Sequence, residues 1–543
     1  MNVFTTLDWS VLILFFIALG TIIWWAIKQK QDSSEDYFLA GRNLGWFVIG
    51  ASIFASNIGS EHIVGLAGTA ADSGMAMGHY ELHSWIILLL GWVFVPFYLR
   101  STVFTMPEFL ERRYSESARW ILTIITLVSY VLTKVSVTVY AGAVVFETLM
   151  GIEFWSGALL IVLVTGAYTI LGGLRAVIYT DALQAMVLLF GSITITVTGL
   201  IKIGGWGNLI DQVGSSHFNM FLPYDHPDFP WVGMVFAPPI IGIWYWCTDQ
   251  YIVQRVLSAK NERQARKGTI FAGYLKLLPI FMFFIPGLIA YAMSKSGQLN
   301  YTSSDQVFPT LVRELLPSGL RGLVAGGLIA ALMSSLSSVF NSCSTLFTID
   351  IYKKLKPNTS EKKLVFVGRV ATAVVVITGV LWIPLMKVVS SGGLYTYLQS
   401  VQAYIAPPIA AVFLLGLFWS RINSSGALAA LIGGFSAGMI RLGLEINKAN
   451  LEDGIWLSIA ELNFLYFAIF SFLSCIATLI IVSILTPAPD SDKLEGLTYE
   501  TTLSTDKENS KNSWNNIDVL NSAIIIAIVL MILLYFSPIG IGG

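Results

Sequence analysis

Long runs of apolar residues are the feature that most restricts what this chain can fold into. The hydrocarbon core of a bilayer, about 30 Å thick, is spanned by roughly 20 apolar residues in an α-helix. We find fourteen such runs in the 543 residues, and only 12% of the chain is charged, whereas soluble domains carry about 25%. The sequence therefore predicts an all-α integral membrane protein with 14 transmembrane helices.

The apolar runs and the basic residues together predict an orientation. The expected spans cover about 9–27, 44–71, 79–99, 120–150, 154–171, 177–203, 231–256, 270–293, 320–352, 365–386, 394–419, 426–444, 455–485 and 523–536. The division between the fifth and sixth spans rests on Gly172, Gly173 and Arg175. Lys and Arg concentrate in cytoplasmic loops, and most of the 32 basic residues lie in inward loops if the N-terminus is outside. We expect a multi-pass protein of the inner (plasma) membrane with both termini outside.

Two of the spans contain helix-breaking residues. The second span has three glycines around a polar block at residues 56–62, and the seventh contains Pro238, Pro239 and Gly242. Once the first helix is set aside, each interrupted span opens a group of five, 44–203 and 231–419. Two such halves are typical of inverted-repeat transporters, whose binding site lies between the broken helices.

This arrangement divides the chain into seven regions. They are an extra N-terminal helix with the first cytoplasmic loop (1–43), the first inverted repeat (44–203), an extracellular loop (204–230), the second inverted repeat (231–419), two additional helices (420–485), a polar cytoplasmic loop (486–516), and the last helix with an extracellular C-terminus (517–543). The loop 486–516 is rich in Ser, Asp, Glu and Asn, a composition typical of disorder.

The ninth span carries a cluster of hydroxyl groups. The cluster consists of Ser334, Ser335, Ser337 and Ser338. Small residues also allow helices to pack closely, so the cluster alone has two interpretations. A hard cation prefers several oxygen ligands. The carbonyls of Ala55 and Ile58, beside the break in the second span, and the carboxylate of Asp181 could complete a cation site with these hydroxyls.

A second set of intramembrane side chains suits a neutral polyol. The set contains Asn57, His62, Glu81, Lys276 and Gln399, with the rings of Trp244, Tyr245 and Trp246. Polar groups of this kind select a ligand because they are left unpaired when a hydroxyl is missing. Tryptophan is also common at membrane interfaces, and the chain has 16, so the rings alone do not define a site.

Several longer motifs give the chain a family resemblance. They are DYFLAGR at 36–42, GASIFASNIGS at 50–60, GGLRAVIYTD at 172–181, WYWCTDQ at 244–250, GYLK at 273–276, FNSCSTLFTID at 340–350 and APPIAAVFLL at 406–415. Through them the chain, from Asp36 to Thr486, resembles the sodium/solute symporter family and, within it, the sodium/glucose cotransporters. The resemblance implies a five-plus-five inverted-repeat (LeuT-type) fold with one extra N-terminal and three extra C-terminal helices, working by alternating access.

The resemblance also implies the site residues. The sugar site would contain Asn57, His62, Glu81, Tyr245, Trp246, Lys276 and Gln399, with Tyr245 also acting as a gate. Sodium site one would use the carbonyls of Ala55, Ile58 and Ala331 with the hydroxyls of Ser334 and Ser335. Sodium site two would use Asp181, Ser334, Ser337 and Ser338. We therefore expect the import of a hexose of the glucose or galactose type with two Na⁺ ions.

Two positions depart from the family pattern, and the cargo has alternatives. Gly242 stands where sugar-carrying members have a polar side chain, and Glu61 stands where animal members have glycine. An amino acid, sialic acid, inositol or a vitamin is therefore an alternative cargo. A cargo carboxylate would favour an arginine in the cavity; no intramembrane arginine is expected, although Lys276 keeps this alternative open.

Other classes of protein fit the sequence less well. A sugar sensor should carry a signalling domain, and residues 486–516 are too few for one. An enzyme needs a nucleophile with a base, or a metal set, and none is found. We expect Na⁺ as the coupling ion, no organic cofactor, a small neutral sugar and membrane lipid as partners, no nucleic acid, and a monomer sufficient for transport.

Overall fold

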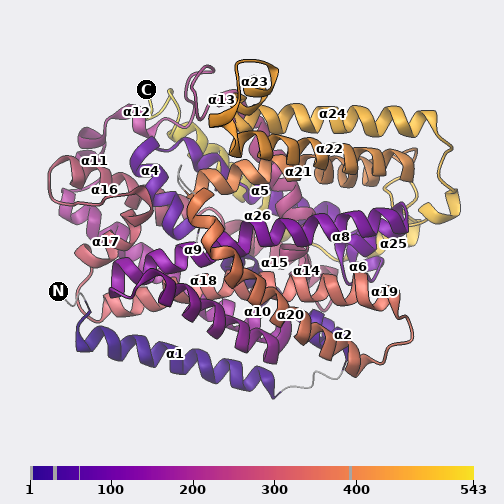
Figure 1. The fold of residues 1–543 in the computed structure, drawn as a ribbon, viewed down its shortest axis with the longest axis horizontal. Coiled ribbons are helices and arrows are strands. Elements are labelled where there is room, and N and C mark those ends of the chain that lie inside the picture. The colour runs from indigo at the N-terminus through magenta and orange to yellow at the C-terminus, as the bar shows by residue number, and fades with distance from the viewer. Residues whose placement is uncertain (1–3, 29–32, 60, 390–393) are drawn as a thin grey trace.

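The computed structural model describes residues 4–28, 33–59, 61–389 and 394–543, and these residues form helices joined by short loops (Figure 1). In the first part of the chain the α-helices are α1 (Thr6–Ile27), α2 (Ser34–Leu39), α3 (Trp46–Asn57), α4 (Ala67–Ser73), α5 (Ser84–Leu89), α6 (Val95–Arg100), α7 (Met106–Arg113), α8 (Glu116–Tyr130), α9 (Ser136–Val145), α10 (Phe154–Ile203), α11 (Trp206–Val213) and α12 (Ser215–Phe218). In the second part they are α13 (Trp231–Gly242), α14 (Gln250–Leu257), α15 (Glu262–Leu275), α16 (Ile285–Lys295), α17 (Val307–Leu315), α18 (Leu320–Thr345), α19 (Lys353–Leu355), α20 (Glu361–Val389), α21 (Leu394–Phe418), α22 (Ser424–Ile446), α23 (Ile455–Glu461), α24 (Phe464–Leu485), α25 (Ser504–Asn512) and α26 (Asn516–Tyr535).

Short turns of π- or 3₁₀-helix extend or join these helices. The π-helical turns are Glu61–Leu66, Leu90–Phe94, Val131–Val135, Phe146–Met150, Ile243–Thr248, Ile280–Phe284 and Leu346–Tyr352. The 3₁₀ turns are Ala40–Arg42, Ala76–Tyr80, Ser304–Gln306, Lys448–Asn450 and Ser491–Leu494. π-helical turns inside α-helices are frequent at functional sites. Two of the turns, Glu61–Leu66 and Ile243–Thr248, lie beside the two predicted breaks.

Among the described residues, eleven helical stretches are long and apolar enough to cross a membrane. One of them, α10, covers two predicted spans, and α3–α4 and α20 correspond to two more. These matches confirm a multi-span helical membrane protein, while the total of 14 stays a prediction. The last span is longer than predicted, because α26 begins at Asn516.

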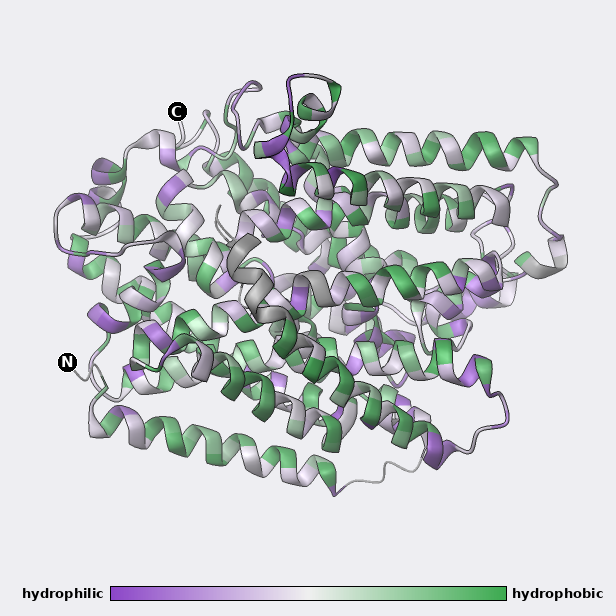
Figure 2. Ribbon diagram, in the orientation of Figure 1, coloured by the Kyte–Doolittle hydropathy of each residue, from purple (hydrophilic) through white to green (hydrophobic). Residues whose placement is uncertain are grey.

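The degree of burial orders the helices from the centre to the lipid-facing surface. In α18, 94% of the most apolar window is buried inside the protein, whereas in α1 and α24 the value is 22%. Figure 2 shows hydrophobic residues along most of the length of α1 and α24. The central helix α18 packs against α10, α1, α3, α9 and α20, so its serines lie in the middle of the protein.

The predicted division inside residues 154–203 is a sharp break in α10. At Gly173 the backbone has φ 56° and ψ −159°, which is not helical. A Cβ at this position would lie 2.8 Å from the carbonyl oxygen of Tyr37. Glycine is therefore required here both by the backbone conformation and by the close approach of the segment that contains Tyr37.

Both predicted helix interruptions are present, but the second lies later than the prolines suggest. Helix α3 ends at Asn57, and Ile58 has the non-helical angles φ −74° and ψ 80°. Helix α13 continues through Pro238 and Pro239, and the chain becomes extended at Asp249 (φ −79°, ψ 126°), whose side chain caps α14. Backbone groups freed in this way are tolerated within a membrane protein where they line a cavity or hold an ion.

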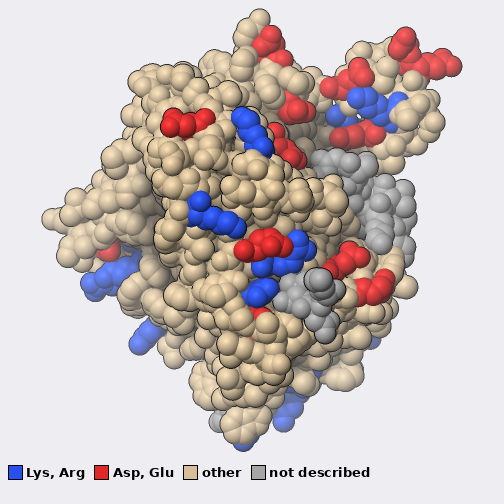
Figure 3. All heavy atoms as spheres, turned by 90° about the vertical axis from the view of Figure 1, so that its left-hand side faces the viewer, with Lys and Arg blue, Asp and Glu red and all other residues tan. Residues whose placement is uncertain are grey.

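The two ends of the described chain lie at similar positions along the bundle. The start of α1 and the residues after α26 lie at the same end of the bundle (Figure 1), where charged side chains of both signs cover a small part of the visible face (Figure 3).

The segment 486–516, for which composition indicated disorder, contains α25. Asp506 on this helix lies 3.5 Å from Arg100, and Ser513 just beyond it donates to Glu262 at 3.0 Å.

Candidate functional site

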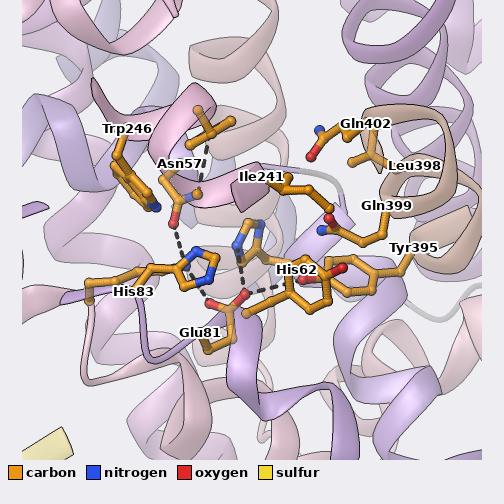
Figure 4. Close-up of a pocket in the computed structure, with 14 residues that line it drawn as sticks. Asn57, His62, Glu81, His83, Ile241, Trp246, Tyr395, Leu398, Gln399 and Gln402 are labelled. Carbon is orange, nitrogen blue, oxygen red and sulfur yellow. Dashed lines mark hydrogen bonds and ion pairs between the residues drawn. The ribbon is translucent and has the colours of Figure 1, made fainter. Parts of the chain in front are cut away.

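A small pocket lies where the two interrupted helices approach each other. Its empty volume, which includes space open to solvent, is about 370 Å³. All seven residues predicted for a sugar site line it, namely Asn57, His62, Glu81, Tyr245, Trp246, Lys276 and Gln399. Figure 4 shows most of them around the pocket. The structure brings these residues together; their binding of a solute remains a prediction.

Helix ends place the polar side chains of this pocket. Asn57 is the last residue of α3, and Lys276 is the C-cap of α15. His62 lies in the π-helical turn that follows the break after α3, and Gln399 lies in α21. The ends of α3 and α15 therefore bring Asn57 and Lys276 to the pocket, whereas Gln399 comes from within α21.

An ion pair occupies one side of the pocket. Lys276 Nζ donates to Glu81 Oε2 at 2.6 Å and to Asn57 Oδ1 at 2.7 Å. His62 Nε2 lies 3.3 Å from Glu81 Oε1, and the Tyr395 hydroxyl donates to the same oxygen at 3.4 Å. Glu81 and Lys276 are each 1% exposed. Buried charges require such partners, and Glu81 has three of them here: Lys276, His62 and Tyr395.

Tyr245 lies between the pocket and a second buried ion pair. Its hydroxyl accepts a hydrogen bond from Asn57 Nδ2 at 3.3 Å. On another side, Lys134 Nζ lies 4.5 Å from the centre of the Tyr245 ring and 2.7 Å from Asp249 Oδ2. Tyr245 therefore contacts both the pocket and the second ion pair, and its role as a gate remains a prediction.

Three polar atoms around the pocket have no hydrogen-bond partner within the described part of the chain. They are the Tyr80 hydroxyl oxygen, His83 Nε2 and Gln399 Oε1. Buried polar atoms are nearly always paired in native proteins, so these three atoms are available to a polar ligand.

Sequence reasoning missed four polar lining residues. These are Tyr80, His83, Tyr395 and Gln402. Two signals could have found them. Tyr80 and His83 flank Glu81 in the chain, and Tyr395 and Gln402 stand four residues before and three after Gln399, on the same face of α21.

The candidate ion ligands gather around Asp181 on α10. Its carboxylate is fully buried and accepts hydrogen bonds from Ser52 at 2.7 Å, from Ser56 at 3.2 Å and from Ser334. The Ser52 and Ser56 hydroxyls belong to α3 and were not predicted. They show that the broken helix and α18 meet at this carboxylate.

The other predicted ion ligands differ in their contacts. Ser335 Oγ lies 3.5 Å from the carbonyl oxygen of Ser56, next to the break in α3. Ser338 Oγ is 3.4 Å from Ser56 Oγ, whereas Ser337 Oγ donates to the Ser334 carbonyl of its own helix at 2.9 Å. Ala55, Ile58 and Ala331 are buried in α3, just after it, and in α18.

One sequence expectation is wrong here, because a buried arginine stands beside the candidate ion site. Arg255 in α14 is 0% exposed, and its Nη2 lies 3.6 Å from Asp181 Oδ2. The same side chain donates to Ser52 at 3.1 Å and to Ser338. This position contradicts the sequence-based expectation of no intramembrane arginine, because Arg255 lies at the end of the seventh predicted span and is buried beside Asp181.

Gly242 and Glu61 are the two positions that depart from the family pattern. Gly242 lines the pocket, and a Cβ added to it would lie 3.0 Å from His83 Nδ1 and Cε1. The side chain of Glu61 lies outside the described residues. Only Gly242 can therefore be interpreted in structural terms.

Comparisons with known proteins agree with this geometry. Residues 37–434 match the model of the sodium:solute symporter family. The chain is similar to sodium/glucose cotransporter 1 of Oryctolagus cuniculus, with 39% identity over 531 residues covering 89% of this chain and 80% of that protein. It is also similar to sodium/myo-inositol cotransporter 2 of Homo sapiens, with 38% identity covering 91% and 79%.

Solved structures show the same fold. A Na⁺-coupled sialic acid symporter in a substrate-bound outward-open state has a TM-score of 0.76 at 23% identity, covering 90% of this chain and 99% of that one. Mhp1, a nucleobase-cation-symport-1 family transporter, has a TM-score of 0.52 at 12% identity, covering 87% and 99%. The predicted transporter fold is thereby confirmed.

Proposed function

Because the chain belongs to the sodium:solute symporter family and its relatives carry a solute together with Na⁺, we propose that it imports a hexose of the glucose or galactose type with two Na⁺ ions. The hexose occupies the pocket formed by Asn57, His62, Glu81, Tyr245, Trp246, Lys276 and Gln399. Transport proceeds by alternating access in the plasma membrane, with both termini outside and a monomer as the working unit.

One combination in the pocket carries this proposal: the Lys276 charge is paired with Glu81, and three polar atoms are unpaired within the described part of the chain. The Lys276 ammonium is 2.6 Å from Glu81, so a cargo carboxylate would approach a carboxylate as well as a cation. The unpaired Tyr80 hydroxyl, His83 Nε2 and Gln399 Oε1 suit ligand hydroxyls, which both donate and accept. A neutral polyol fits these groups better than an amino acid or sialic acid.

Myo-inositol is the second candidate cargo. A sodium/myo-inositol cotransporter is 38% identical to this chain, and inositol presents hydroxyls to the same polar groups. The geometry of the pocket favours a polyol over an anion. Uptake of labelled glucose, galactose and myo-inositol decides between a hexose and inositol.

Two sodium sites couple the cargo to the membrane gradient in this proposal. Site one uses the carbonyls of Ala55, Ile58 and Ala331 with Ser334 and Ser335, and it joins the broken helix α3 to α18. The support is the end of α3 at Asn57 and the approach of Ser335 Oγ to the Ser56 carbonyl at 3.5 Å. Sodium at this site stabilises the arrangement that exposes the pocket, because an ion shifts an equilibrium only by binding one state more tightly.

Site two uses Asp181, Ser334, Ser337 and Ser338. Its support is the convergence of hydroxyls on the buried Asp181 carboxylate. At 100 mV one inward charge is worth about 2.3 kcal/mol, and a tenfold sodium gradient adds about 1.4 kcal/mol. One ion then drives roughly 500-fold accumulation of a neutral solute, and two drive roughly 10⁵-fold.

The assay that tests the cargo is uptake by purified protein in liposomes under a fixed inward sodium gradient. Labelled glucose, galactose, myo-inositol, sialic acid and an amino acid are compared. We expect uptake of glucose or galactose, and the variant Gln399→Ala to reduce it while sodium binding is retained. Uptake confined to inositol would replace the hexose with the second candidate, and uptake confined to an anionic solute would contradict the polyol proposal.

A further inference from the structure

His83 is a buried polar side chain of the pocket that is outside the predicted sugar site. It lies two residues after Glu81, at the N-cap of α5, and is 5% exposed. Its Nε2 has no hydrogen-bond partner among the described residues. In Figure 4 the imidazole extends from the side of the pocket where Trp246 lies, opposite Gln399 and Gln402.

The backbone of Gly242 makes room for this imidazole. A Cβ built on Gly242 would lie 3.0 Å from His83 Nδ1, 3.0 Å from His83 Cε1 and 2.5 Å from Ile86 Cδ1. These distances are shorter than ordinary van der Waals contact, so a Cβ at position 242 would require the end of the Ile86 side chain to move and the His83 ring to shift by a few tenths of an ångström. The side chain at position 242 therefore affects where the His83 ring lies at the wall of the pocket.

We propose that His83 hydrogen-bonds the cargo directly through Nε2 and, together with Gly242, determines which polyol the pocket accepts. This inference rests on the proposed polyol cargo and adds a specificity residue to it. A neutral imidazole presents Nε2 as a donor or as an acceptor, and a hydroxyl group can pair with it in either form. Buried polar atoms are nearly always paired in native proteins, and a hydroxyl of the cargo would pair this one.

Three substitutions of His83 distinguish a hydrogen bond to the cargo from a role in packing. In His83→Gln the side-chain amide nitrogen lies near the position of Nε2, whereas in His83→Asn it lies near Nδ1. We expect His83→Asn and His83→Ala to raise the KM for labelled glucose about tenfold, the size of one lost hydrogen bond, and His83→Gln to retain most of the affinity. Sodium binding without sugar should be unchanged in all three.

Position 242 provides a second, independent variant. We expect Gly242→Ser to weaken glucose uptake because its Cβ displaces the His83 ring. The double variant Gly242→Ser/His83→Ala should transport better than Gly242→Ser alone, since the smaller residue removes the overlap. The matched control is His79→Ala, because His79 contacts the Met220 carbonyl at 3.0 Å and is outside the pocket lining; its KM should equal that of the unaltered protein.

Competition by deoxy sugars tests the same hydrogen bond from the side of the ligand. In the unaltered protein, one of the monodeoxy-glucoses should compete about tenfold more weakly than glucose because it lacks the hydroxyl that meets His83, and in His83→Ala this one difference should disappear. If His83→Ala keeps the KM for glucose and the full pattern of competition by the deoxy sugars, the inference is wrong while the proposed function stands. If the unaltered protein moves no labelled polyol under a sodium gradient, the proposed function fails, and this inference fails with it.

Discussion

The Arg255 guanidinium lies 3.6 Å from the Asp181 carboxylate, and both side chains are completely buried between α14, α10, α3 and α18. Arg255 also donates to Ser338, one of the proposed ligands of sodium site two. A cation that belongs to the protein therefore already neutralises the carboxylate that would receive the second Na⁺. If Na⁺ occupies site two as proposed, we expect it to compete with Arg255 for Asp181 and Ser338.

The first prediction concerns this pair. Arg255→Gln should destabilise the protein by about 3–5 kcal/mol in the absence of sodium, because it leaves a buried carboxylate uncompensated. Saturating Na⁺ should restore more stability to this variant than to the unaltered protein, since a ligand of the folded state stabilises it more when it binds more tightly, and the competing guanidinium is absent from the variant. Thermal unfolding in NaCl and in choline chloride measures both effects. Arg255→Lys is the matched control; an equal response to Na⁺ in Arg255→Gln and the unaltered protein would contradict the competition.

The second prediction separates the sodium sites. Ser335→Ala should raise the sodium concentration needed for half-maximal uptake, because its hydroxyl approaches the end of α3 at the Ser56 carbonyl. Thr345→Val, on the same helix, is the control, since the Thr345 hydroxyl donates to the Asn341 carbonyl of its own helix at 2.8 Å. Sodium titration of uptake provides the test, and an unchanged sodium dependence in Ser335→Ala would remove this residue from site one.

A third prediction concerns the number of coupled ions. Asp181→Asn should reduce the charge moved per sugar from two to one, because site two loses its carboxylate while Ser335 and the carbonyls of site one remain. The reversal potential of sugar-dependent current in liposomes measures this ratio. A ratio that is the same in Asp181→Asn and in the unaltered protein would show that Asp181 holds no coupled ion.

The fourth prediction concerns the ion pair of the pocket. Lys276→Gln should abolish uptake and lower stability by about 3–5 kcal/mol, because Glu81 would remain charged and buried without its cation. The double variant Glu81→Gln/Lys276→Gln should regain stability without regaining transport. Thermal unfolding and uptake are compared in the same preparations. Normal uptake in the double variant would contradict a role for this pair in binding.

The fifth prediction concerns Tyr245. Tyr245→Phe removes the hydroxyl that accepts from Asn57 at 3.3 Å, and the affinity for glucose should fall by up to about tenfold. Tyr245→Ala also removes the ring beside Lys134 and should allow glucose efflux without sodium. Efflux from preloaded liposomes measures the leak, and an efflux rate equal to that of the unaltered protein would argue against a gate at this position.

The sequence predicted the helical spans and the break in α10 well, because both depend on local properties. Apolar length alone identifies a span, and Gly173 follows another glycine and stands two residues before Arg175. The seventh span was harder, because the two prolines drew attention to residues 238–239 whereas the chain becomes extended at Asp249. Proline is tolerated within a membrane helix where neighbouring groups satisfy the freed backbone.

The parts that sequence could not predict depend on three-dimensional contacts. The sequence predicts no intramembrane arginine because the distribution of charge along the chain carries no information on depth. The buried Arg255 pairs with Asp181, which is 74 positions away in the chain. His83 and Tyr80 were missed because a histidine or tyrosine in an apolar segment is usually a packing residue. Only the arrangement of α13 and α21 around the pocket gives these side chains a role.

The most direct measurement is the uptake of labelled glucose into liposomes that contain the purified protein, compared under an inward Na⁺ gradient, with equal Na⁺ on both sides, and with K⁺ in place of Na⁺. We predict accumulation above the external concentration only under the Na⁺ gradient, and its loss in Ser335→Ala at low sodium. Glucose entry at the same rate in all three conditions would contradict sodium coupling through the junction of α3 and α18.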